Sequence, residues 1–88
     1  MSERDPEIVY SDLCRKVTRD RITVEVVISR LEGASEWSLE VVNDKGTSTV
    51  WEELFATDED AYAEFERTVA EEGMRTFLDD GKVIPFRR

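Results

Sequence analysis

The chain has 88 residues, of which 21 are acidic and 12 basic, with one cysteine and no histidine. This length suits one domain with a single modest core, and one cysteine excludes a fold held together by internal disulfides. The net charge of −9 argues against direct binding to nucleic acid or to an anionic membrane surface.

The first twelve residues are mostly polar and include a proline, and we expect them to form a loose N-terminal arm, which Ile8, Val9 and Tyr10 could dock onto the domain. Apolar and polar residues alternate over residues 13–19, which predicts a short edge strand. Four cations between Arg15 and Arg21 suit an edge, because charge discourages unwanted strand pairing. Residues 19–21 then predict a tight turn, which the central aspartate can accommodate.

The clearest strand covers residues 22–31, where β-branched residues recur with period two. A second alternation occupies residues 37–42, after a polar loop. The Asn-Asp-Lys-Gly run at residues 43–46 predicts a hairpin turn, in which glycine takes the left-handed backbone that closes a bulge. The next strand would cover residues 47–53, so the predicted sheet spans residues 13–53.

The hydrophobic period changes after this sheet. The Thr57 hydroxyl can accept a backbone hydrogen bond as an N-cap, and the three acids that follow meet the positive end of a helix dipole. Apolar residues recur at four-residue spacing from Ala61 to Val69, which predicts an apolar stripe. Gly73 is a typical C-terminal cap. We therefore expect a helix over residues 57–73.

Short linkers between successive strands favour an antiparallel meander. We expect one α+β domain over residues 1–88, with a four-stranded antiparallel sheet, the order β-β-β-β-α, and the C-terminal helix packed on one sheet face. In the tail, residues 74–88, we expect the apolar cluster of Met74, Phe77 and Leu78 to form a further helical turn, and residues 82–88 to be a short extended segment or frayed. The predicted core consists of Val24, Val26, Ile28, Leu39, Val41, Phe65 and Val69.

The sequence contains no pattern that predicts catalysis. Without histidine there is no Cys–His or Ser–His pair, and one cysteine cannot build a structural zinc site. If Asp58 is taken as the first position of an EF-hand loop, Ala63 stands where glycine is needed and Val69 where glutamate is needed. We therefore expect a protein that is not an enzyme, with no metal site and no cofactor.

Apolar residues also alternate onto the sheet face that one helix cannot cover. An exposed apolar patch commonly marks an interface. The candidate interaction surface consists of Val27, Leu31, Val42 and Trp51, with Val50 as the alternative to Trp51.

Three interpretations of function remain open. The favoured one is a protein-interaction module with an unknown protein partner, which could be a second copy in a homodimer. The acidic stretch from Glu32 to Asp80 supports a second, an acidic inhibitor that mimics nucleic acid and occupies a basic site on another protein. The third is a small-ligand binder that uses Trp37 and Trp51.

Targeting signals give a further expectation. No stretch approaches the roughly 18 apolar residues of a membrane span. Residues 1–7 are charged where a signal peptide would become apolar. We therefore expect a cytoplasmic protein that does not bind membranes.

Three runs give the chain a resemblance to a known group: WSLEVV at residues 37–42, GTSTVW at residues 46–51, and FATD at residues 55–58. Over residues 13–78, about three quarters of the sequence, the chain resembles short uncharacterised proteins of proteobacteria. The resemblance implies a compact bacterial α+β domain and transfers no active-site residue.

Overall fold

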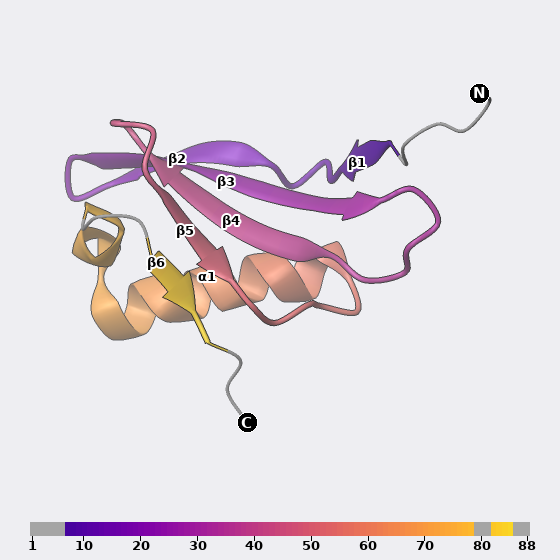
Figure 1. Cartoon of the computed structure of the whole chain (residues 1–88). Coiled ribbons are helices and arrows are strands. Elements are labelled where there is room, and N and C mark those ends of the chain that lie inside the picture. Colours follow the sequence, from indigo (N-terminus) through magenta and orange to yellow (C-terminus); the bar gives the residue numbers. More distant parts are fainter. Residues whose placement is uncertain (1–6, 79–81, 86–88) are drawn as a thin grey trace.

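Six strands form one mixed sheet in the computed structural model of the chain, which describes residues 7–78 and 82–85. The strands are β1 (Ile8–Tyr10), β2 (Arg15–Arg19), β3 (Ile22–Leu31), β4 (Ser38–Asn43), β5 (Ser48–Trp51) and β6 (Lys82–Ile84). Their order is β1-β3-β4-β5-β6, and β2 also pairs with β3. Two helices, α1 (Asp58–Glu72) and the 3₁₀ helix η1 (Met74–Leu78), lie between β5 and β6 in the chain (Figure 1).

The longest strand, β3, has the bounds that its period-two pattern predicts. It pairs with β4 along one edge and with both β1 and β2 along the other. β1 pairs with the end of β3, where Tyr10 is opposite Ser29, and β2 pairs nearer its start, where Lys16 is opposite Glu25. Two short strands therefore share one edge of β3.

The polypeptide between these two short strands is irregular, yet it still satisfies the backbone of β3. The Ser11 amide donates to the Ile28 carbonyl at 2.9 Å. The Ile28 amide donates to the Cys14 sulfur at 3.2 Å. A thiol thus accepts the hydrogen bond that a strand carbonyl would otherwise accept.

The expected four-stranded meander is correct in its α+β class and wrong in its strand count. The additional strands are β1, in the expected arm, and β6, in the expected tail. β6 runs parallel to β5, with Val83 opposite Val50, so the chain crosses over through α1 and η1 to reach it. Three-residue strands such as these depend on a sheet edge that is distant in sequence, so local alternation could not predict them.

The predicted helix is present as α1, and its caps are those that the sequence indicates. The Thr57 hydroxyl accepts a hydrogen bond from the Asp60 amide at 3.0 Å. At the other end, Gly73 has φ of 80° and its amide donates to the Val69 carbonyl, a conformation that glycine adopts without steric cost.

The core lies between this helix and one face of the sheet, and α1 contacts both β3 and β4. Its centre is Phe65, which is fully buried, with its ring 5.6 Å from that of Tyr62 and 5.8 Å from that of Phe77. Of the predicted core residues, Val69 alone is only partly buried. The buried apolar residues are Val17, Val24, Val26, Ile28, Leu39, Val41, Trp51, Phe55, Ala61, Phe65, Met74 and Phe77.

Asn43, at the end of β4, links the sheet to η1. Its buried amide group donates to the Phe77 carbonyl at 2.9 Å, while its side-chain oxygen accepts from the Lys45 and Thr47 amides. One side chain therefore holds the β4–β5 turn closed and attaches η1 to it.

Candidate functional site

Cross-strand partners point to the same side of a sheet, so the register sorts the side chains into two faces. One face packs against α1 and η1, and we call it the covered face. The opposite face has no helix against it in the described part of the chain, and we call it the open face. Its apolar members are Ile8, Tyr10, Val27, Leu31, Val42, Val50 and Val83.

Exposed apolar side chains are concentrated on the open face. Within residues 7–78 and 82–85, seven large apolar side chains are between 37% and 61% exposed. Five belong to the open face, and a sixth, Leu54, lies beside it, where it lines a hollow of about 250 Å³ with Leu31 and Ser38. The seventh, Leu78, is on η1. The six are Ile8, Tyr10, Leu31, Val50, Leu54 and Val83.

The open face includes three of the four residues predicted for the interaction surface. Val27 and Val42 are half-buried and Leu31 is half-exposed. Trp51 is not on this face, and its assignment there is wrong. It is 3% exposed on the covered side, and its indole nitrogen donates to the Glu64 carboxylate at 3.0 Å. The register places Val50 on the open face instead.

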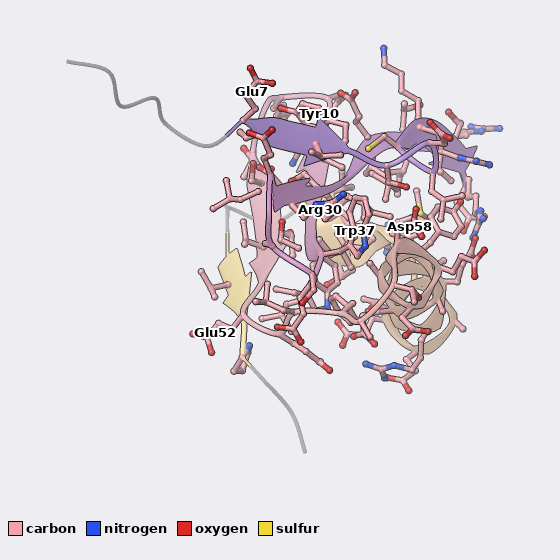
Figure 2. The ribbon with its side chains drawn as sticks, turned by 90° about the vertical axis from the view of Figure 1, so that its right-hand side faces the viewer. Glu7, Tyr10, Arg30, Trp37, Glu52 and Asp58 are labelled. Atoms are coloured by element: carbon pink, nitrogen blue, oxygen red, sulfur yellow. The ribbon has the colours of Figure 1, made fainter. Side chains whose placement is uncertain are left out.

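The two tryptophans do not form a common wall for a ligand. Trp51 is buried next to Phe77, with ring centroids 6.4 Å apart. Trp37 is half-buried, and the Arg30 guanidinium lies 5.1 Å from its ring centroid. Figure 2 shows Arg30 and Trp37 close together, and Asp58 at the start of α1. A ligand that stacks on the Trp37 ring would first have to displace the Arg30 side chain.

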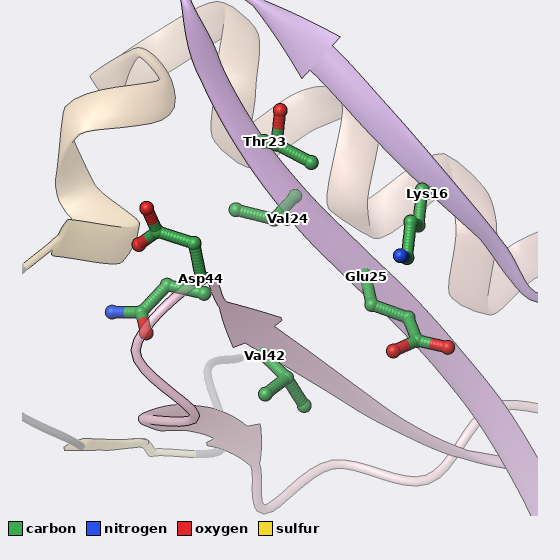
Figure 3. A pocket seen from close by; sticks show the side chains of 7 residues that line it. Lys16, Thr23, Val24, Glu25, Val42 and Asp44 are labelled. Carbon is green, nitrogen blue, oxygen red and sulfur yellow. The ribbon is translucent and has the colours of Figure 1, made fainter.

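A pocket of about 290 Å³ opens on the open face, where β2, β3 and β4 lie side by side. Lys16 from β2 and Glu25 from β3 are adjacent in it, with Val42 from β4 next to Glu25 (Figure 3). Thr23, Asn43 and Asp44 complete the polar part of its wall, and Val24 also lines it. The pocket therefore brings one cation, two carboxylates and two apolar residues together within one small area.

Tyr10, at 61% the most exposed large apolar residue in the described part of the chain, also belongs to this face (Figure 2). The sequence pattern did not indicate Tyr10 as a surface residue of the sheet, because Tyr10 lies in the mostly polar arm. The alternation of Ile8 and Tyr10 was the available signal, but three residues are too few to predict a strand.

The cations of β2 mostly contact α1 of the same chain. Arg19 makes two hydrogen bonds of 2.8 Å to the Glu66 carboxylate, and Arg15 lies 5.5 Å from the Tyr62 ring centroid. The Arg19 hydrogen bonds lower the pKa of Glu66, partly opposed by desolvation. Lys16, which points to the other side of β2, remains with the open face.

The described residues contain no group of three His, Cys, Asp or Glu side chains arranged to hold a metal ion. Within the same residues, the helices are too short or too polar to cross a membrane. Comparison with family models, with curated proteins and with solved structures finds no match to this chain. A functional proposal therefore has to rest on the open face itself.

Proposed function

We propose that the chain is a protein-interaction module that associates with a second copy of itself through the open face. The observation that carries this proposal is the position of the exposed apolar residues. Six of the seven in the described residues lie on or beside this face, and the helix-covered side of the sheet is already closed. Exposed apolar groups gathered in this way commonly mark an interface.

The area and the energy favour a pair of copies. A stable interface buries about 800 Å² on each partner, a modest part of the 6001 Å² surface of this chain. Complete burial of a large apolar side chain stabilises by roughly 1.5–3 kcal/mol, and these residues begin about half exposed, so each contributes about half of that. Several such residues on one face together favour association, and they act against the charge repulsion and the freedom of motion lost when two copies pair.

The net charge of −9 on each copy opposes pairing, since like charges repel. Salt screens this repulsion over about 10 Å at 0.1 M. The proposed dimer is therefore expected to tighten as salt concentration rises.

Two exposed apolar residues give a matched test. Val50→Asp places a charge on the open face, whereas Leu78→Asp places one on η1, away from that face. We expect the wild-type chain and Leu78→Asp to dimerise in sedimentation equilibrium, and Val50→Asp to remain monomeric. A wild-type chain that stays monomeric at high concentration, in both low and high salt, would contradict the proposal.

The acidic-inhibitor interpretation has weaker support. Glu66 binds Arg19, and both Glu64 and Glu71 bind Arg67. Three carboxylates of α1 are thus paired with two arginines of the same chain, which offsets two of their three charges and reduces the negative field that a basic partner would meet. Salt-sensitive binding to a basic protein by the Val50→Asp monomer would favour this alternative.

A further inference from the structure

Tyr10 and the open-face pocket are on the same side of the sheet and along the same edge of β3. Tyr10 is opposite Ser29, and Lys16 of the pocket is opposite Glu25. Val27 is midway between Ser29 and Glu25 in the strand. Because β1 and β2 share this edge, Tyr10 and Lys16 lie at equal distances along β3 on either side of Val27.

A row of residues crosses the sheet at this midpoint. The direct cross-strand partners in it are Val27 on β3, Glu40 on β4, Val50 on β5 and Val83 on β6. A two-fold axis along this row would bring two open faces together with β3 antiparallel to its copy. With such an axis, each strand faces the same strand of the other copy, running in the opposite direction. The end of β3 that pairs with β1 therefore faces the end of the copy's β3 that pairs with β2. It places Tyr10 of one copy over the pocket of the other.

We propose that Tyr10 of one copy occupies the open-face pocket of the second copy, so that the symmetric dimer contains this contact twice. The inference rests on the proposed self-association and adds to it the residue that each copy contributes to its partner. Tyrosine is well suited to this position, because it combines a large apolar ring with one polar group.

The pocket offers a partner for each part of a tyrosine side chain. The Lys16 ammonium can lie against the face of the ring as a cation–π contact. Either the Glu25 or the Asp44 carboxylate can accept the phenol hydrogen, and Val42 provides apolar contact with the ring edge. A volume of about 290 Å³ accommodates one aromatic side chain. Filling it would also withdraw from water the ring that is 61% exposed in the single chain.

Glu40 is the charged member of the central row and would approach its own copy across the axis. Its carboxylate accepts a hydrogen bond from the Ser48 hydroxyl at 2.6 Å, which directs it toward β5. Repulsion between the two Glu40 side chains adds to the salt dependence of the dimer. The Tyr10 contacts, which are away from the axis, are the contacts that would fix the orientation of the two copies.

Single substitutions give the first test. Tyr10→Ala should weaken the dimer by about tenfold or more in sedimentation velocity, as is typical when an aromatic residue buried in an interface is truncated. Leu78→Ala, which truncates another exposed apolar residue away from the open face, should leave the dissociation constant unchanged. Lys16→Glu should also weaken the dimer, and more than Lys45→Glu, which makes the same charge change outside the pocket. Circular dichroism checks that each variant is folded.

Mixing two variants gives the decisive test. The Tyr10→Ala homodimer lacks both tyrosines and the Lys16→Glu homodimer lacks both intact pockets, but their heterodimer keeps one tyrosine and one intact pocket. With dyes on the N-terminal amines, energy transfer should therefore show a heterodimer tighter than either homodimer. A heterodimer no tighter than the tighter of the two homodimers, or equal affinity for Tyr10→Ala and Leu78→Ala, would overturn this inference and leave self-association standing. A monomeric wild-type chain would overturn both.

Discussion

The covered and open faces of the sheet are made from the same strands, and they differ in what closes them. On the covered face, Val24, Val26 and Ile28 are almost completely buried beneath α1 and η1. On the open face of the same strand, Val27 is half-buried and Leu31 half-exposed. The side chains of β3 are thus buried in the core on one face of the sheet, whereas apolar side chains on the other face stay partly exposed.

Polar pairs on the open face explain how the single chain tolerates this surface. The Thr18 and Thr23 hydroxyls are 2.7 Å apart, and the Ser38 hydroxyl donates to the Ser29 carbonyl. These polar side chains lie between the apolar ones, so the open face is more polar than a core and more apolar than an ordinary solvated surface. The mixture suits an interface whose two halves are each stable in water before they meet.

The largest expected effect comes from removing an aromatic residue from the covered side. Phe65→Ala empties a fully buried site between two other rings and should lower the free energy of unfolding by about 3–5 kcal/mol. Val83→Ala, on the open face, should lower it by less than about 1 kcal/mol in the monomer. Urea denaturation at low protein concentration measures both. Similar losses for the two variants would mean that the faces do not differ as described.

A smaller effect is expected for polar groups. Asn43→Ala removes three hydrogen bonds on the covered side and leaves the buried Phe77 carbonyl without its partner, so it should cost about 2–3 kcal/mol. Ser48→Ala removes one hydroxyl bond to Glu40 on the open face and should cost about 0.5 kcal/mol. If thermal unfolding ranks the two variants in the opposite order, Asn43 does not connect the turn to η1 as described.

The smallest effect concerns the edge where β2 meets α1. Arg19 lowers the pKa of Glu66 below its ordinary 4.5, so the folded state favours the charged carboxylate. This contribution is fully present above pH 4.5 and is lost as the pH falls through the folded pKa. Because both side chains are more than a third exposed, it should not exceed about 1 kcal/mol. The stability difference between wild type and Glu66→Gln should therefore disappear in acid, and a difference that persists there would contradict this origin.

Local pattern was sufficient to predict the elements that depend on local chemistry. The β-branched residues of β3 define a strand wherever its partners lie, and Thr57 with its acidic followers starts a helix on its own. The turn before β3 was also predicted correctly without glycine. Asp20 and Arg21 take φ of 53° and 66° there, so the strand pairing on either side holds two L-residues in the left-handed region.

Features of the candidate surface that depend on register could not be predicted in the same way. The sequence left Val50 and Trp51 as alternatives for the open face, because alternation has the same period whichever residue points outward. The pairing of Val50 with Glu40 and Val83 decides between them. The pocket joins Lys16, Glu25 and Val42 from three strands, and no local pattern indicates that they are neighbours.

The divided edge of β3 has a consequence for polymerisation. Exposed strand edges can template the addition of further strands, which leads to fibrous aggregates. Here β1 offers three residues and β2 five, and between them the backbone of Ile28 is bonded to Ser11 and to the Cys14 sulfur. A strand from another molecule would lose its register at this interruption. This break should therefore prevent fibres from growing by strand addition at the β1–β2 edge in concentrated solutions. Pairing through the open face can then be measured without interference from such growth.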